Sequence, residues 1–276
     1  SDSQFHAVTS SGGPGNLGAV FKVTSTGTYT SLGSISPTNG WMPGGAPSVL
    51  DSNSLLFPMT SGGSGGGGNV MKVTTSGVVS VEAALGGTLG SATDGALVQA
   101  GADWYGVAAK GGASARGTMF RFTPGAGAAL VSSFVNSGGS LSEGPLVQGL
   151  DGLFYGVSRE GGASTRGTIY RINTTGTRTR LVSFTGTGGA APGAKPRGPL
   201  VLADDGNFYG LAEEGGPNNT GVVFRLTNAG VYSVMSAFGS TGARSPQGGF
   251  AKGVDGFLYA TTSLGGTADA GCLIRF

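Results

Sequence analysis

Pairs of adjacent glycines recur at nearly constant intervals along the whole chain, and this recurrence constrains the fold more than any other feature. The first glycines of the pairs are Gly12, Gly62, Gly111, Gly161, Gly215 and Gly265, which lie 50, 49, 50, 54 and 50 residues apart. Nine residues after each first glycine comes an apolar residue, then a base, then a second apolar residue, as in Tyr170-Arg171-Ile172. The two features together indicate six copies of one unit.

The fourth copy shows best how one unit is built. Strands a, b, c and d are predicted at 145–148, 153–157, 168–172 and 180–184, because these stretches are rich in branched and aromatic residues. The Gly, Pro, Asp, Asn and Ser residues between them supply the backbone angles that turns require. No segment has an apolar period near 3.6 residues, so the sequence predicts an all-β protein. Four antiparallel strands in a copy of about 50 residues are typical of a β-propeller blade.

The uniform repeat predicts a single β-propeller domain over residues 1–276. The six repeats are predicted at about 1–45, 46–95, 96–144, 145–198, 199–248 and 249–276. The first copy lacks strand a and the last lacks strand d, which gives 22 strands, whereas six blades would have 24 and five would have 20. The six glycine pairs favour six blades, with five blades or a β-solenoid as alternatives.

Composition excludes several classes of protein. Glycine accounts for 57 of 276 residues but follows no Gly-X-Y period, so the chain is not collagen-like. The 16 bases and 14 acids are too evenly balanced for a nucleic-acid partner. A single cysteine, Cys272, excludes an internal disulfide and a cysteine-based zinc site, and no stretch approaches the roughly 18 apolar residues of a membrane span. Low charge and a start at Ser1 without methionine predict an extracellular protein, secreted or surface-associated, whose signal peptide has been removed.

Antiparallel order places the a-b and c-d turns at one end of each blade, the turn face, and the b-c and d-a loops at the other end, the loop face. Turn aspartates such as Asp151 and strand c bases such as Arg171 both lie near the turn face, so we expect structural aspartate–base pairs. A tyrosine column in strand b, which includes Tyr155, is expected to pack in the core or at its edge. His6, the only histidine, occupies this position in the first copy without a Gly-x-Ser-x-Gly motif, so a serine hydrolase triad is not indicated. No metal site and no cofactor are predicted.

The copies differ most at the loop face, and loops on a rigid frame are where binding sites are built. Trp41 is the most suggestive residue, because it lies in a d-a loop with Gly and Pro neighbours, where an exposed ring can stack on a ligand. Trp104 begins a strand b and is expected in the core. The other candidate binding residues precede strand a or the glycine pair, and they are Asp94, Glu143, Arg197, Gln247, Lys110, Glu160 and Glu214.

The fourth copy reads PLVQGLDGLFYG at 145–156, then Gly161-Gly162-Ala163, and then GTIYRI at 167–172. This pattern resembles the GloVer-type tandem repeat of exported and surface-anchored bacterial proteins, and the resemblance covers nearly all of the chain. It implies an exported protein, but it implies no established activity and no catalytic residues. The second copy departs from the pattern, with Leu55-Leu56-Phe57-Pro58 in place of Phe-Tyr-Gly and a glycine-rich loop at 62–68.

Together these features favour an exported, non-catalytic recognition module that binds a glycan or a surface polymer on its loop face. Two alternatives remain open. In the first, the chain is a structural or self-assembling extracellular module, and the unpaired edges of its incomplete copies pair with another chain. In the second, it is a hydrolase or lyase acting on polysaccharide, with Asp94 and Glu143 as the catalytic candidates, because glycoside hydrolysis needs two carboxyls roughly 5 to 9.5 Å apart.

Overall fold

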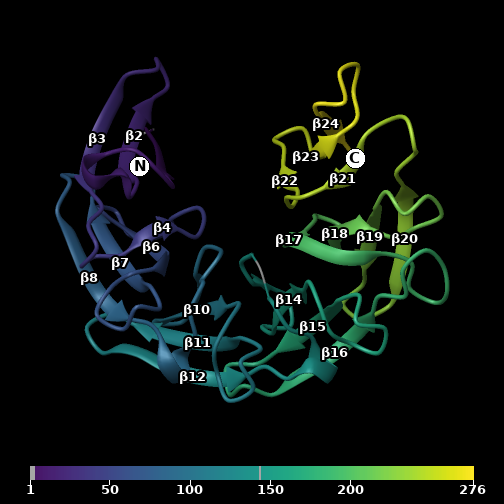
Figure 1. The fold of residues 1–276 in the computed structure, drawn as a ribbon, viewed down its shortest axis with the longest axis horizontal. Coiled ribbons are helices and arrows are strands. Elements are labelled where there is room, and N and C mark those ends of the chain that lie inside the picture. Colours follow the sequence, from purple (N-terminus) through teal and green to yellow (C-terminus); the bar gives the residue numbers. More distant parts are fainter. Residues whose placement is uncertain (1–3, 143) are drawn as a thin grey trace. The chain divides into compact units, whose positions relative to one another are not determined.

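The computed structural model describes residues 4–142 and 144–276, and within them the regular elements are strands and short 3-10 turns. The strands form six antiparallel sheets, one for each copy. The prediction of an all-β, six-bladed β-propeller is therefore confirmed, and the sheets are numbered blade 1 to blade 6 along the chain. Blades 1 to 3 belong to one compact unit, Ser1–Ser133, and blades 4 to 6 to a second, Phe134–Phe276 (Figure 1).

The first unit contains a three-stranded blade followed by two larger ones. Its strands are β1 (Gln4–Thr9), β2 (Ala19–Thr24), β3 (Tyr29–Ser34), β4 (Trp41–Pro43), β5 (Ser48–Asp51), β6 (Ser54–Ser61), β7 (Asn69–Thr74), β8 (Val79–Ala84), β9 (Val98–Ala100), β10 (Asp103–Ala108), β11 (Thr118–Thr123) and β12 (Gly127–Ser133). In blade 2 the inner strand is in two pieces, since β4 and β5 both pair with β6. The 3-10 turns η1 (Pro14–Asn16) and η2 (Gly87–Leu89) lie in the loops.

The second unit begins with a 3-10 turn, η3 (Asn136–Gly138), and contains blades 4 to 6. Its strands are β13 (Val147–Gln148), β14 (Phe154–Ser158), β15 (Thr168–Ile172), β16 (Arg178–Ser183), β17 (Ala194–Leu202), β18 (Phe208–Glu214), β19 (Val222–Leu226), β20 (Tyr232–Ala237), β21 (Arg244–Pro246), β22 (Ala251–Lys252), β23 (Leu258–Leu264) and β24 (Cys272–Arg275). In blade 6 the inner strand is again in two pieces, since β21 and β22 both pair with β23.

The predicted strands of the fourth copy agree with β13 to β16 to within about two residues at each end, because turn residues bound every one of them. Among the described residues, blade 1 has no strand a and blade 6 has no strand d, as the sequence predicted. The sequence did not predict how early strand a begins. In blade 5 it starts at Ala194, in the predicted d-a loop, and its register shifts between Arg197 and Val201.

Packing between neighbouring sheets forms the core, which explains why strands b and c have no polar face. In β15, Ile169 and Tyr170 are completely buried. Between blades 4 and 5, the ring of Tyr155 stacks on that of Phe208 with 4.2 Å between the centroids. Trp104 is 4% exposed and belongs to a cluster shared by blades 2 and 3, so its predicted core position is confirmed. Burying one large apolar side chain stabilises the folded state by about 1.5–3 kcal/mol. The apolar contacts between neighbouring sheets are therefore a main source of stability.

In blades 4 to 6, the aspartates of the tight turns accept hydrogen bonds from tyrosine hydroxyls. The expectation that these aspartates pair directly with the strand c bases is therefore corrected. The donor–acceptor pairs are Tyr155 to Asp151 at 2.8 Å, Tyr209 to Asp205 at 2.8 Å and Tyr259 to Asp255 at 2.6 Å. Each tyrosine lies across from the strand c base, as Tyr155 does from Arg171. The bond from Tyr259 is the main cause that lowers the pKa of Asp255. Because the arrangement recurs from blade to blade, it holds the turns in place and does not mark a single site.

Tyr170 links the core to alkaline stability. Burial raises the pKa of its phenol, whose oxygen lies 2.6 Å from Ser142 Oγ. When an acidic group has a higher pKa in the folded protein than in the unfolded chain, the folded protein loses stability as the pH rises above the unfolded pKa. For tyrosine the unfolded pKa is about 10. We therefore expect the free energy of unfolding to fall above about pH 10, and to fall less steeply in Tyr170→Phe. Denaturant titrations at several alkaline pH values measure both slopes.

The control is Tyr29→Phe, because Tyr29 is 59% exposed and its removal should leave the alkaline slope unchanged. Identical slopes for the wild type and Tyr170→Phe would contradict the role assigned to Tyr170.

Candidate functional site

Three charged side chains from blades 4 and 5 meet at the loop face of the second unit. Arg159 follows β14, Arg197 lies on β17, and Glu213 lies near the end of β18. Glu213 Oε2 is 3.5 Å from an Arg159 Nη2 atom and 3.1 Å from Arg197 Nε. The side chain of Arg159 is 23% exposed, that of Arg197 29% and that of Glu213 14%. One carboxylate thus holds two guanidinium groups in a partly buried cluster, which we call the charged cluster.

The charged cluster departs from the pattern that the other blades follow. Arg159 and Glu213 stand two residues before the glycine pair, and the corresponding residues of the other copies are Ser10, Thr60, Ala109 and Ser263. In blade 2 the Thr60 hydroxyl donates to the Met42 carbonyl, and in blade 6 the Ser263 hydroxyl donates to the Ser245 carbonyl. These bonds fasten the d-a loop to strand b. A hydroxyl is sufficient for that structural role, so the fold does not require the charges in blades 4 and 5.

A second ion pair lies next to the charged cluster. Lys195 Nζ is 2.6 Å from Glu214 Oε1, so the predicted site residue Glu214 has a basic partner. Lys195 has a left-handed backbone with φ of 50°. The corresponding d-a loop residues are also left-handed in blades 2, 3, 4 and 6, and they are Met42, Ala92, Leu141 and Ser245. The conformation therefore belongs to the repeated loop, and only the charge on Lys195 is particular to blade 5.

The other predicted site residues do not converge on one place in the described structure. Trp41 is half-buried and packs against the apolar cluster of blades 1 and 2, so only part of its ring can meet a ligand. The side chains that lie exposed are those of Asp94, Lys110, Glu160 and Gln247. Glu143 lies outside the described residues, so the Asp94–Glu143 pair of the hydrolase hypothesis gains no geometric support.

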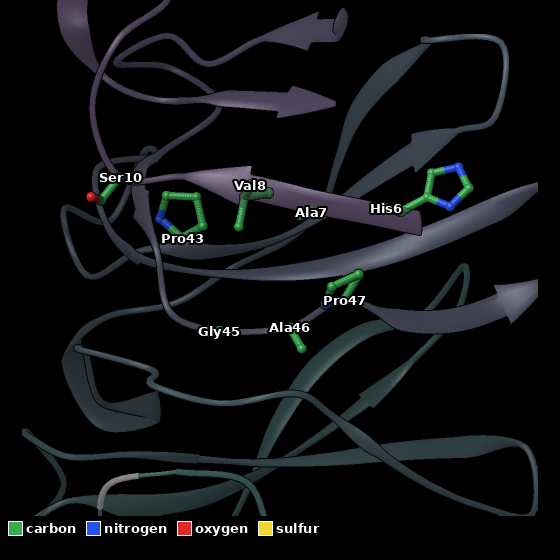
Figure 2. A pocket seen from close by; sticks show the side chains of 8 residues that line it. All are labelled: His6, Ala7, Val8, Ser10, Pro43, Gly45, Ala46 and Pro47. Atoms are coloured by element: carbon green, nitrogen blue, oxygen red, sulfur yellow. The ribbon is translucent and has the colours of Figure 1, made fainter. Parts of the chain in front are cut away.

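A cavity of about 380 Å³ lies between β1 and the segment 43–47 in the first unit. Its lining is mostly apolar, with His6 and Ser10 as the polar members. Figure 2 shows these two side chains at opposite ends of the cavity, so they do not form a nucleophile–base pair. Within the described residues, His6 Nε2 is buried and has no hydrogen-bond partner. His6 lies opposite Lys22, the base of strand c in this copy, as Tyr155 lies opposite Arg171 in blade 4, so His6 does occupy the tyrosine position.

A second cavity, of about 370 Å³, lies between blades 5 and 6 at the turn face. Tyr209, Phe257, Leu258 and Phe276 are among its lining residues. Leu258 occupies the position that Phe208 has in blade 5, and the smaller side chain cannot reproduce the Tyr155–Phe208 stack. Sequence reasoning missed this cavity, although a leucine at 258, where blades 3 to 5 have Trp104, Phe154 and Phe208, was a signal for it.

Across residues 4–142 and 144–276, no three His, Cys, Asp or Glu side chains are grouped so that they could hold a metal ion. The same part of the chain contains no helix with the length and apolar character that a membrane crossing requires.

Substituting Glu213 tests the energetic role of the charged cluster. Glu213→Gln removes the carboxylate from between two partly buried guanidinium groups, and we expect it to lower the free energy of unfolding by roughly 1–2 kcal/mol. Glu214→Gln is the matched control, because Glu214 is 33% exposed and has one lysine partner. Its loss should stay below about 1 kcal/mol, as is usual for exposed pairs. Chemical denaturation of both variants measures the difference, and equal losses would contradict a special role for Glu213.

The family model described as Gloeobacter/Verrucomicrobia repeat matches residues 1–195. The match covers more than half of the chain, so the chain belongs to this family, and the resemblance drawn from the repeat is confirmed. No curated protein matches the chain.

Solved structures with a similar fold include proteins of several kinds. Virginiamycin B lyase from Staphylococcus aureus has a TM-score of 0.62 at 12% identity, and the alignment covers 100% of this chain and 85% of that one. The periplasmic gluconolactonase of Pseudomonas aeruginosa has a TM-score of 0.62 at 15% identity, with 99% and 83% covered. The extracellular domain of a putative hybrid two component system from B. thetaiotaomicron has a TM-score of 0.58 at 9% identity, with 98% and 31% covered. At these identities the likeness shows the fold alone.

Proposed function

We propose that this member of the Gloeobacter/Verrucomicrobia repeat family is an exported, non-catalytic recognition module that binds a glycan or a surface polymer at its loop face. The observation that carries the proposal is the charged cluster of Arg159, Arg197 and Glu213, which interrupts the repeat where the fold needs only a hydroxyl. A structural feature recurs in every blade, whereas a site for one ligand is built once.

The chemistry of the charged cluster suits a ligand with many hydroxyl groups. A guanidinium presents up to five donors and a carboxylate several acceptor positions, so together they can bind both the oxygen and the hydrogen of a sugar hydroxyl. The mutual ion pairs hold the three side chains in place before the ligand arrives, which reduces the entropy lost on binding. Glu214 and Glu160 of the second unit are proposed as further contacts for this ligand. The accessible part of Trp41 is proposed as a separate contact on the loop face of the first unit.

Recognition fits the acids of this region better than hydrolysis does. A glycoside hydrolase needs one carboxyl that donates a proton and a second that acts as nucleophile or base. Glu213 is held by two arginines and Glu214 by Lys195. Both carboxylates are already engaged by basic side chains, so neither is free to approach a glycosidic bond as the acid or the nucleophile of a hydrolase.

An extracellular location is part of the proposal. It is supported by the low charge of the chain, by the exported proteins that the repeat resembles, and by the periplasmic and extracellular descriptions of two structural neighbours. These neighbours share the fold only, so their ligands are not carried over.

The test is direct binding of purified protein to an array of bacterial and plant polysaccharides, followed by calorimetry with the best ligand. Arg159→Gln and Arg197→Gln should each weaken binding about ten- to a hundredfold, the loss expected when a hydrogen bond to a charged group is removed. Arg121→Gln, which removes an arginine 3.6 Å from Asp103 in the first unit, is the matched control and should bind like the wild type. Thermal melts confirm that every variant is folded.

Two outcomes would overturn the proposal: no polysaccharide binds the wild type, or all three arginine variants bind it equally well. Release of reducing ends from the bound polymer would contradict the non-catalytic part and favour the hydrolase alternative.

A further inference from the structure

Apolar side chains fill the turn-face end of the boundary between blades 4 and 5. The ring of Phe208 stacks on that of Tyr155, and Leu202 packs against the same core cluster. Leu150, in the a-b turn of blade 4, extends over the a-b turn of blade 5, because a Cβ atom on Gly206 would lie 3.7 Å from its Cδ1 atom. This boundary shows which side chains the repeat uses to close the space between two blades.

The boundary between blades 5 and 6 departs from this arrangement at three positions. The residues at these positions are Leu258, Lys252 and Asp204, in the places of Phe208, Leu202 and Leu150. Lys252 Nζ forms an ion pair with Asp204 Oδ1 where the other boundary has apolar side chains. Apart from its chain neighbours, no described residue has an atom within 4 Å of a Cβ placed on Gly256, the counterpart of Gly206. The cavity of about 370 Å³ lies in the space that these changes leave.

The form of this cavity does not depend on the segment that follows strand c. Phe276 of strand c lines the cavity, and its counterpart in blade 5 is Leu226. In blade 5 the c-d turn after Leu226 reaches the outer strand of blade 4, because a Cβ atom on Gly230 would lie 3.5 Å from Leu181 Cδ2. The cavity lies instead beside the a-b turns, next to the inner strands. The a-b turns and strands b and c therefore determine its form.

Three aromatic rings line the cavity, and they belong to Tyr209, Phe257 and Phe276. The ring centroids of Tyr209 and Phe276 are 5.8 Å apart. The guanidinium of Arg275 lies 4.4 Å from the centroid of the exposed Phe257 ring, and this cation–π contact helps to hold the ring in place. Leu258 is buried and packs in the same core cluster as Tyr209. The wall of the cavity is thus largely apolar and offers aromatic ring faces.

The ion pair supplies polar groups at the rim of the cavity. The side chain of Lys252 is 39% exposed and that of Asp204 is 79% exposed, so both can meet a ligand that enters from solvent. An ammonium donates hydrogen bonds and a carboxylate accepts them, so the pair can bind both the oxygen and the hydrogen of one hydroxyl group. The two charges of the pair cancel, which favours a neutral ligand over an ion. An apolar wall with a few placed polar groups is typical of a small-molecule site.

We propose that this cavity binds a small aromatic compound with a hydroxyl group, such as a phenol. The ring occupies the space that Phe208 fills between blades 4 and 5, and it stacks on Tyr209 as Phe208 stacks on Tyr155. The hydroxyl group of the ligand bonds to Lys252 and Asp204 at the rim. This site lies at the turn face, whereas the charged cluster lies at the loop face, so the inference stands apart from the proposed glycan site.

The test uses the 276-residue chain and 2-naphthol, a fluorescent compound with an aromatic ring system and one hydroxyl group. A fluorescence titration should show saturable binding of one molecule per chain. Decahydro-2-naphthol, the saturated analogue, should compete at least about tenfold more weakly, because it keeps the hydroxyl group but has no aromatic face to stack on Tyr209.

Two variants restore residues of the repeat and should weaken binding of 2-naphthol. Leu258→Phe places the ring of blade 5 in the cavity, and we expect binding to weaken at least about tenfold. Val254→Phe is the matched control, because Val254 lies in the same turn, is fully exposed and does not line the cavity. Lys252→Leu removes the ion pair at the rim and should weaken binding about three- to tenfold. Thermal melts confirm that each variant is folded.

Three results would overturn the inference. They are no saturable binding of 2-naphthol by the wild type, equal binding by folded Leu258→Phe and Val254→Phe, and equal competition by the saturated analogue, which would mean that the cavity does not select an aromatic ring. If Leu258→Phe does not fold, unchanged binding by Lys252→Leu overturns the inference instead. Leu258→Phe should keep the polysaccharide binding assigned to the charged cluster, and Arg197→Gln should keep the binding of 2-naphthol. Failure of this inference is therefore distinguishable from failure of the proposed function.

Discussion

Apolar packing between neighbouring sheets is the interaction on which the rest of this structure depends. A four-stranded sheet of some 50 residues cannot bury both of its faces alone, so each blade is stable only when a neighbour covers it. The stacked rings of Tyr155 and Phe208 show this dependence directly, because one comes from blade 4 and the other from blade 5. The two-sided burial of Ile169 and Tyr170 shows that strand c sits within the core and not on its surface.

Once the sheets pack in this way, the repeat determines which positions are available for function. The turn face is occupied by the bonds between tyrosine and aspartate that recur from blade to blade, such as Tyr209 to Asp205. The strand b column before the glycine pair is used in blades 2 and 6 to fasten the d-a loop through a hydroxyl. Blades 4 and 5 replace that hydroxyl with Arg159 and Glu213, so the same frame presents a charged group where other blades present a structural bond. Departure from the repeat is therefore a better guide to a site here than the identity of any single residue.

The cavity between blades 5 and 6 also arises from a departure from the repeat. Leu258 is smaller than the phenylalanine in the matching position of blade 5, and space remains beside Tyr209. The backbone around this space keeps the geometry of the repeat, because the ladder hydrogen bonds of each sheet hold it in place.

The sequence by itself determined the number of copies, the all-β class, the strands of the fourth copy and the core position of Trp104, because these follow from local patterns that the copies repeat. It also identified Arg197 and Glu214 as residues of a variable face. Only the tertiary structure decided that Arg197 meets Arg159 and Glu213, since Arg159 and Glu213 are 54 residues apart and come together only when blades 4 and 5 stack. It likewise decided that Trp41 is half-buried and that the turn aspartates bond to tyrosine before any base. Pattern and spacing report which face of a strand a residue occupies, whereas side-chain partners depend on how closely two separate sheets approach, and no local pattern encodes that distance.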